Sequence, residues 1–329
     1  MHAKSDVTVL GAGVSGLTTA ICLAEAGASV AIHAAELPLQ TTSVAAGAVW
    51  APHLVGLDSR ITPWADRTLA RLRELGDAGV PAIHLATGIE VSRTAGSGPP
   101  EFASDTAALS ALGPDEIPAG YLSGWRGSAP LIAMPDYLVY LYERYLRAGG
   151  SPVDQVSYPA LTEAAAAAGS PVLVNCTGSG AHGFVPDPSV TPVRGQVVVV
   201  ANPGITEFFD GFGPDAGDIT YFFPHGDRIV LGGTQEYGNW SRDPDPAVAE
   251  RILAACALVE PALAGATVLA HRVGLRPLRP QVRLESERMP DGTTVVHNYG
   301  HGGAGVTLSW GCAQDAAALA LDALGAFSD

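Results

Sequence analysis

A short apolar run followed by three spaced glycines constrains this chain most. Residues 7–10 read VTVL and predict a short buried strand. Gly11, Gly13 and Gly16 follow it in the spacing G-x-G-x-x-G. In that motif the first glycine permits a tight turn. The second lets a pyrophosphate approach the backbone, and the third lets the following helix pack closely on the strand. The pattern predicts a dinucleotide-binding turn.

The residues around the turn match the structural context that the motif requires. Residues 17–26 predict a helix, and residues 29–33 predict a second apolar strand. Free N–H groups and the dipole at the start of such a helix favour a bound phosphate. An acidic residue for the ribose is expected about 20 residues past the turn. Glu36 is the nearest candidate.

Composition limits the classes of partner. The chain has 329 residues, enough for two domains, and a formal net charge of −15. A negative field of this size repels nucleic acid and anionic membranes, so we expect neither as a partner. Four cysteines lie far apart without metal-ligand spacing, which predicts free thiols and no metal site. We find no signal peptide and no apolar run that spans a bilayer, and we expect a cytoplasmic protein.

Three consecutive hydroxyl residues follow the second predicted strand. Thr41, Thr42 and Ser43 precede a run of small residues at 44–48. Hydroxyl groups suit phosphate oxygens, and small residues allow close approach to a flat group. In isolation, the cluster is also typical of a helix N-cap.

The middle of the chain changes pattern. Residues 65–75, 136–147 and 245–258 predict helices, and residues 171–178 predict a buried strand with a small-residue turn. Between them lie short strands without intervening helices, which favour an antiparallel sheet in a second domain.

A second strand–glycine–helix element lies near the carboxyl end. Residues 294–297 predict a strand, a glycine-rich turn follows at 300–305, and residues 306–324 predict a long apolar helix. The positive end of that helix could stabilise a reduced, anionic ring. Two such elements favour an extended cofactor, FAD, over NAD.

The block VVHNYGHGGAGVTLSWGCA resembles the signature of the D-amino-acid oxidase family. The resemblance extends along nearly the whole chain through GAGVSGL, NCTG, RGQ, YFFP, LGGTQ and GLRPLRPQVRLE. It implies a Rossmann-type FAD-binding domain with a mostly parallel sheet, and a second α+β substrate domain on a largely antiparallel sheet. The expected FAD-binding domain comprises residues 1–55, 135–187 and 270–329. The expected substrate domain comprises residues 56–134 and 188–269.

The resemblance also implies site residues. Arg279 matches the arginine that holds the substrate carboxylate, although its neighbours Arg276 and Arg283 leave a surface ion pair as the alternative interpretation. Tyr221 matches a tyrosine that bonds the same carboxylate, and the carbonyl of Gly303 matches an acceptor for the substrate amine. His53 stands where a tyrosine often lines the pocket, and its alternative role is that of a hydrogen-bonded wall residue.

The implied cofactor contacts lie in both glycine turns and in the segment after the second strand. They are Gly11, Ala12, Gly13, Val14, Ser15, Gly16, Glu36, Thr41, Thr42, Ser43, Gly47, Ala48, Val49, Val156, Gly302, Gly303, Gly305, Val306 and Thr307. For the three hydroxyl residues the resemblance favours pyrophosphate over the N-cap. One departure from the family is that residues 205–220 lack its second active-site tyrosine, which implies a different lid.

The implied activity is oxidation of D-amino acids to imino acids by hydride transfer from Cα to flavin N5, with reduction of O2 to H2O2. No side chain is needed as a base, because positioning and desolvation carry the catalysis. Residues 205–220 contain no Lys, Arg or His, which favours neutral, apolar or basic substrates over D-aspartate. D-aspartate oxidase and glycine oxidase are the enzyme alternatives, and a non-catalytic flavin-binding protein is the alternative from another class. A homodimer is also expected.

Overall fold

The computed structural model describes residues 5–56, 58–98, 109–213 and 219–326. Its strands are β1 (Val7–Leu10), β2 (Val30–Ala34), β3 (Ile83–Ser92), β4 (Ser110–Ala111), β5 (Ser123–Ile132), β6 (Asp154–Gln155), β7 (Val172–Asn175), β8 (Thr191–Ala201), β9 (Phe208–Phe212), β10 (Ile219–His225), β11 (Arg228–Gly232), β12 (Glu236–Tyr237), β13 (Val268–Arg288) and β14 (Thr294–His301). Its α-helices are α1 (Val14–Glu25), α2 (Ile61–Asp77), α3 (Met134–Arg147), α4 (Leu161–Ala168), α5 (Ala181–Phe184), α6 (Pro246–Val259) and α7 (Gly305–Gly325).

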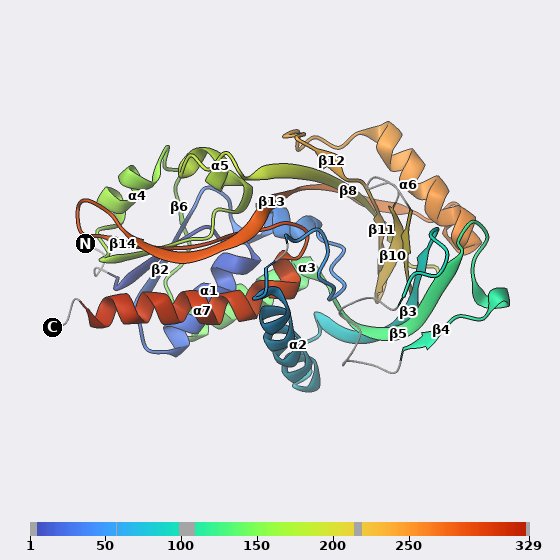
Figure 1. The fold of residues 1–329 in the computed structure, drawn as a ribbon, viewed down its shortest axis with the longest axis horizontal. Helices are drawn as coiled ribbons and strands as arrows, with labels where there is room; N and C mark the ends of the chain where they lie inside the picture. The colour runs from blue at the N-terminus through green and yellow to red at the C-terminus, as the bar shows by residue number, and fades with distance from the viewer. Residues whose placement is uncertain (1–4, 57, 99–108, 214–218, 327–329) are drawn as a thin grey trace.

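One half of the structure is a parallel sheet covered by helices. β1 pairs in parallel with β2 and β7, and β7 pairs in parallel with β14. Every residue of β1 and β7 is buried, as expected for parallel strands covered on both faces. α7 packs against both α1 and α2, and Figure 1 shows it running along the sheet beside α1. This half contains both predicted strand–glycine–helix elements.

The other half is built on antiparallel pairs. β8, β11, β10 and β9 follow one another in the sheet, each antiparallel to the next. β3 departs from this pattern, because it pairs in parallel with β9 and antiparallel with β5. α6 packs on the outside of β8, β10 and β11 (Figure 1).

Two long strands join the halves into one continuous sheet. β13 is 21 residues long and pairs with β8 along one part and with β14 along another. Figure 1 shows β13 and β8 running between the two halves. The predicted mixed α/β class, with a parallel part and a largely antiparallel part, is therefore confirmed. Among the described residues, no helix has both the length and the apolar run needed to cross a bilayer.

The predicted elements are present with shifted ends. The first helix begins at Val14 instead of residue 17, so Gly16 lies within its first turn. β14 continues through His301, beyond the predicted strand at 294–297. Residues 205–220, expected to act as a lid, form β9 and the start of β10. Positions 214–218 of that segment lie outside the described residues.

Candidate functional site

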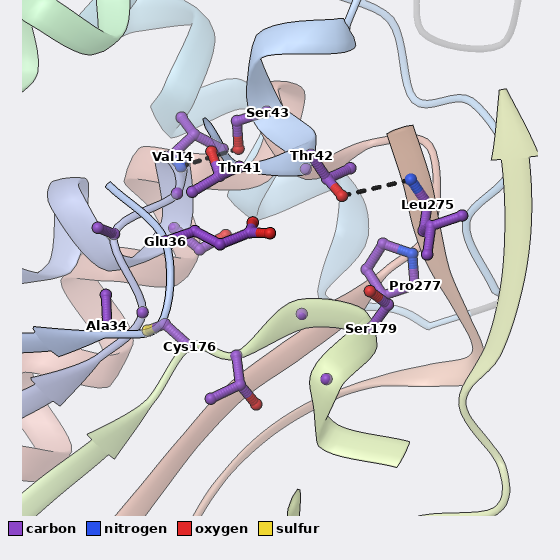
Figure 2. A pocket seen from close by; sticks show the side chains of 18 of the residues that line it. Val14, Ala34, Glu36, Thr41, Thr42, Ser43, Cys176, Ser179, Leu275 and Pro277 are labelled. Atoms are coloured by element: carbon purple, nitrogen blue, oxygen red, sulfur yellow. Dashed lines mark hydrogen bonds between the residues drawn. The ribbon is translucent and has the colours of Figure 1, made fainter. Parts of the chain in front are cut away.

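Both glycine turns open into one cavity of about 620 Å³. The cavity is lined by Gly11 to Ser15 at the start of α1 and by Gly302, Gly303 and Gly305 at the start of α7. Strand β13 contributes a further stretch, Gly274 to Pro277. Figure 2 shows Val14 of the first turn and Leu275 and Pro277 of β13 around this space. An extended ligand in this cavity therefore contacts both ends of the chain.

The three predicted hydroxyl residues lie between α1 and β13. Ser43 accepts a hydrogen bond at its Oγ from the backbone N–H of Val14 at 3.0 Å. Thr42 accepts one from the N–H of Leu275 at 3.3 Å (Figure 2). Thr41 is the N-cap of the short 3₁₀ helix Thr42–Ala45, but its side chain makes no capping bond. Thr41 therefore occupies an N-cap position without a side-chain capping bond, and all three residues line the cavity.

The turn at α1 has the close backbone packing that a dinucleotide site requires. Gly11 has φ +110°, a conformation that L side chains rarely adopt. A Cβ on Gly16 would lie 1.9 Å from the carbonyl oxygen of Gly11, so only glycine fits there. Gly16 supports the turn without lining the cavity, in keeping with its predicted packing role. A Cβ on Gly13 would lie 3.1 Å from the Ser43 Oγ, beside the helix start that attracts a phosphate. These residues fit a pyrophosphate.

An ion pair borders the cavity beyond this turn. Glu36 points into the cavity in Figure 2 and forms an ion pair with Arg242. Arg242 also donates to the carbonyl of Gln40 at 2.8 Å and lines the same cavity. Sequence reasoning missed Arg242, which lies about 200 positions away and has no local motif. Val156 lines the cavity as predicted and donates its N–H to Ala34 at 2.9 Å.

The second glycine turn packs directly on the segment around His53. Gly302 has φ +55°, and a Cβ there would lie 1.8 Å from the carbonyl oxygen of Leu54. Gly303 donates its N–H to that same oxygen at 3.1 Å. The Thr307 hydroxyl donates to the carbonyl of Ala51 at 2.7 Å. The start of α7 and the 51–54 segment therefore form one rigid wall.

Arg276, unlike Arg279, lines the cavity. Its Nη1 donates to the carbonyl of Thr234 at 2.9 Å. The guanidinium lies over Gly195, where an added Cβ would meet Nη1 at 2.3 Å. No carboxylate within the described part of the chain forms an ion pair with it. Burial lowers the pKa of Arg276, but a guanidinium stays charged in proteins. A half-buried cation without a counter-ion at the edge of a cavity suits an anionic ligand.

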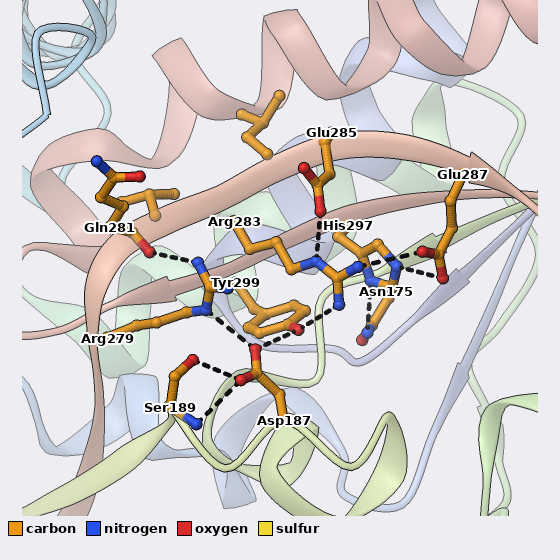
Figure 3. Close-up of polar contacts among 12 residues, drawn as sticks. Asn175, Asp187, Ser189, Arg279, Gln281, Arg283, Glu285, Glu287, His297 and Tyr299 are labelled. Atoms are coloured by element: carbon orange, nitrogen blue, oxygen red, sulfur yellow. Dashed lines mark hydrogen bonds and ion pairs between the residues drawn. The ribbon is translucent and has the colours of Figure 1, made fainter.

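Arg279 does not reach the cavity, so its predicted role must be corrected. Its Nε donates to Asp187 at 3.0 Å, and its Nη1 donates to the carbonyl of Gln281 at 2.9 Å. Figure 3 shows the guanidinium within a polar network that also contains Tyr299 and Arg283. Arg276 lies in the stretch of β13 that pairs with β8, whereas Arg279 follows Leu278, where the pairing with β14 becomes irregular. The alternative interpretation of Arg279 as an ion pair is the one that the structure supports.

Asp187 stabilises the fold through this network. Burial opposes its ionisation, but hydrogen bonds from Ser189, Tyr299 and Arg279 outweigh that effect and lower the pKa of Asp187 to about 2. A depressed pKa contributes stability above the unfolded value near 3.9, and this contribution disappears as the pH falls through about 2. We expect Asp187→Asn to lower the free energy of unfolding at pH 7 by about 2 kcal/mol.

Urea unfolding of FAD-saturated protein measures this difference. The difference in free energy of unfolding between Asp187→Asn and the parent protein should narrow as the pH falls from 4 towards 2. Over this range only the parent loses a negative charge at position 187. Equal stability at pH 7 would remove Asp187 from this role.

Tyr221 and His53 lie beside Arg276. The Tyr221 ring covers Gly232, where an added Cβ would lie 2.0 Å from the ring Cζ. Burial raises the pKa of Tyr221 to about 12, so its hydroxyl remains a hydrogen-bond donor at neutral pH. Burial, and then the charge of Arg276, lowers the pKa of His53 to about 4. His53 is hydrogen-bonded to Gln235 at 2.9 Å, as expected for a wall residue.

The predicted site residues as a whole divide into two groups. Those that line the cavity are Gly11, Ala12, Gly13, Val14, Ser15, Glu36, Thr41, Thr42, Ser43, Val156, Gly302, Gly303, Gly305 and Val306. Those outside its lining are Gly16, Gly47, Ala48, Val49, His53, Tyr221, Arg279 and Thr307. Gly47 packs on Tyr221 and Phe223, where an added Cβ would lie 3.0 and 2.9 Å away. Ala48 adopts φ 59°, and Val49 bridges to Leu131.

Comparison with known proteins places the chain in a family. Residues 6–319 match the model of the DAO family, described as FAD dependent oxidoreductase. The chain belongs to this family of FAD-dependent oxidoreductases.

Curated relatives align with this chain over almost its whole length. D-amino-acid oxidases of Rubrobacter xylanophilus and Streptomyces coelicolor are each 46% identical to this chain, with 96% of both chains covered. The human D-aspartate oxidase is 33% identical, with 95% of this chain and 94% of the relative covered. Among solved structures, a glycine oxidase from Geobacillus kaustophilus shares the fold with a TM-score of 0.77 and 19% identity, covering 98% of this chain and 95% of that one. The predicted resemblance to D-amino-acid oxidases is confirmed.

Proposed function

We propose that this enzyme oxidises D-amino acids to imino acids with FAD and passes the electrons to O2. The observation that carries the proposal is Arg276, whose guanidinium lines the cavity and forms no ion pair among the described residues. A planar guanidinium binds a carboxylate through two parallel hydrogen bonds. The names of the relatives at 46% identity point to the same substrate class.

The chain's own residues bind and orient the substrate. Arg276 binds the α-carboxylate, and the Tyr221 hydroxyl donates a further hydrogen bond to it. The Gly303 carbonyl accepts from the α-amine. His53 is neutral at pH 7 and packs beside Phe212, with ring centroids 5.9 Å apart, so it closes the site to water without adding charge. The flavin, when bound, accepts two electrons and a proton equivalent from the substrate Cα–H bond. Positioning and exclusion of water therefore carry the catalysis.

Oxygen uptake with a panel of D-amino acids tests the proposal. FAD-loaded protein should consume O2 and form H2O2 with neutral or basic D-amino acids, and consume far less with D-aspartate. An acidic side chain requires a second cation, and residues 205–220 supply no Lys, Arg or His. A strong preference for D-aspartate would indicate a D-aspartate oxidase instead. A preference for glycine would favour a glycine oxidase.

Gly195 offers a test of how Arg276 is held. We expect Gly195→Ala to raise KM for a D-amino acid about 10- to 100-fold, because the added methyl displaces the guanidinium that lies over this position. Steady-state kinetics measure the change, and flavin content should stay at the parent level. Gly76→Ala is the control, because its nearest neighbour would be Ile83 at 3.7 Å. An unchanged KM in Gly195→Ala would show that this contact does not position Arg276.

We also propose that residues 1–55, 135–187 and 270–329 form the FAD-binding domain and that residues 56–134 and 188–269 form the substrate domain. The parallel strands β1, β2, β7 and β14 and both glycine turns lie in the first set, and β8 to β11 lie in the second. Within the described residues all four cysteines are free, which fits the reducing cytoplasm that we propose as the location of this enzyme.

The expected homodimer stays a prediction that light scattering tests.

A further inference from the structure

Two carboxylates occupy the same row of the sheet as Tyr221. Asp210 on β9 is the direct neighbour of Tyr221 on β10, and Glu90 on β3 is the direct neighbour of Asp210. Side chains of directly paired residues point to the same face of a sheet, on strands about 4.8 Å apart. Glu90, Asp210 and Tyr221 therefore stand side by side on the face that carries the proposed substrate site.

The surroundings of the two carboxylates offer them no partner among the described residues. In the part of the chain that the structure describes, neither forms a hydrogen bond or ion pair through its side chain. Asp210 is only 8% exposed, and aromatic residues Phe208 and Phe212 flank it on the same face. Burial, and then the like charge of Glu90, raises the pKa of Asp210 well above its ordinary value. Burial raises the pKa of Glu90 to about 7. Asp210 is buried and Glu90 is half-buried, and carboxylates removed from water without a partner destabilise a fold, so their presence in this row requires a reason.

The acidic pair and Arg276 lie on opposite sides of Tyr221. The Tyr221 ring leans over Gly232 on β11, away from β9 and towards the strand that carries Gly195. Its electrostatic environment includes the positive charge of Arg276 and the negative charge of Asp210. Phe212, two residues beyond Asp210 on the same face, contacts His53, and His53 in turn packs on Gly303. The acidic pair therefore borders the proposed substrate site.

The distance between the Arg276 guanidinium and Asp210 suits a long substrate. The Arg276 guanidinium lies over Gly195 on β8, and β8 and β9 are separated by β11 and β10. Three strand spacings amount to about 14 Å. A substrate whose α-carboxylate binds Arg276 reaches towards Asp210 only if its side chain is long. A cation at the end of that side chain meets an anionic pair.

We propose that Asp210 and Glu90 form a subsite for the positively charged side chain of a long D-amino acid, such as D-arginine or D-lysine. This proposal rests on the proposed function and names its preferred substrate class. Burial and mutual repulsion disfavour ionisation of the two carboxylates when no cation is bound. A bound guanidinium or ammonium group pairs with them and removes their mutual repulsion.

Matched substrates test the subsite in the FAD-loaded enzyme. D-citrulline is the neutral counterpart of D-arginine, and D-norleucine is D-lysine without its terminal ammonium. We expect kcat/KM to be at least about tenfold higher for the charged member of each pair. Asp210→Asn and Glu90→Gln should each lower kcat/KM for the charged substrates by about tenfold or more. Values for the neutral substrates should stay within about threefold of those of the parent enzyme. Asp227→Asn, whose side chain is 91% exposed, should change neither class and serves as the control.

A binding measurement separates the subsite from catalysis. Calorimetry with 6-aminohexanoate and hexanoate, which lack the reacting amine, should show tighter binding of the charged compound. Asp210→Asn should abolish that difference. If neutral D-amino acids are oxidised but charged members have no advantage, the subsite is refuted and the proposed function stands. Equal losses for both classes in Asp210→Asn would also refute it. If no D-amino acid reduces the flavin, the proposed function itself fails.

Discussion

Replacing Arg276 with alanine is expected to lower kcat/KM for a D-amino acid by about a thousandfold while FAD stays bound. Two charge-assisted hydrogen bonds to a buried carboxylate contribute about 1.5–3 kcal/mol each, and every 1.4 kcal/mol corresponds to a factor of ten. Arg276 has no ion-pair partner among the described residues, so its removal leaves the substrate carboxylate without a cation. Steady-state kinetics together with the visible spectrum of the bound flavin measure both quantities.

Arg279→Ala is the matched control. It removes the same type of side chain from the same strand, but its guanidinium pairs with Asp187 outside the cavity. We expect this variant to lose stability and to keep its KM within about threefold of the parent value. A large rise in KM for Arg279→Ala, with little change for Arg276→Ala, would reverse the assignment made here.

Replacing Gly16 with alanine is expected to abolish FAD binding. The added methyl would lie 1.9 Å from the carbonyl oxygen of Gly11, and backbone cannot move aside as a flexible side chain can. Since Gly11 and Gly13 form the turn that we propose binds the phosphates, opening this contact should disrupt that anion site. We expect FAD affinity to fall by at least about a hundredfold, measured by the fluorescence of released flavin.

Gly76→Ala near the end of α2 is again the control, because its added methyl meets no atom closer than 3.7 Å. Circular dichroism of both variants shows whether the apoprotein keeps its helices. A Gly16→Ala variant that retains FAD at the parent affinity would contradict the role given to this turn.

The sequence predicted best the features that depend on local pattern. The strand at Val7–Leu10 and the glycines that follow are fixed by apolar periodicity and backbone freedom, both of which can be read from neighbouring residues. The long helix after the second glycine turn was predicted within one residue at each end, since its apolar pattern continues to Gly325. The cavity unites these two elements, as the argument for an extended cofactor required.

The choice between Arg276 and Arg279 failed because it depends on which face of β13 points to the cavity. That face is set by pairing with β8, whose Gly195 lies about 80 positions earlier in the chain. One local signal did exist. Gly274 precedes Arg276 by two residues and shares its face, where it leaves room beside the cavity. Arg279 follows Leu278, beyond the stretch of β13 that pairs with β8.

The pairing of Asp210 with Glu90 could not be predicted from local sequence either. In sequence, Asp210 counted only as one of several acids in a segment without cations. Its proposed role depends on strand register. Glu90 lies 120 positions away and becomes the neighbour of Asp210 only through the parallel pairing of β3 with β9. No local pattern reports such pairing.

Anaerobic mixing of FAD-loaded protein with a D-amino acid and with its L enantiomer tests the central claim most directly. The visible absorbance of the oxidised flavin reports electron transfer from the substrate without any contribution from O2. We expect the D enantiomer to bleach the flavin and the L enantiomer to leave it unchanged. A protein that takes up no FAD, or a yellow protein that no D-amino acid bleaches, would contradict the account.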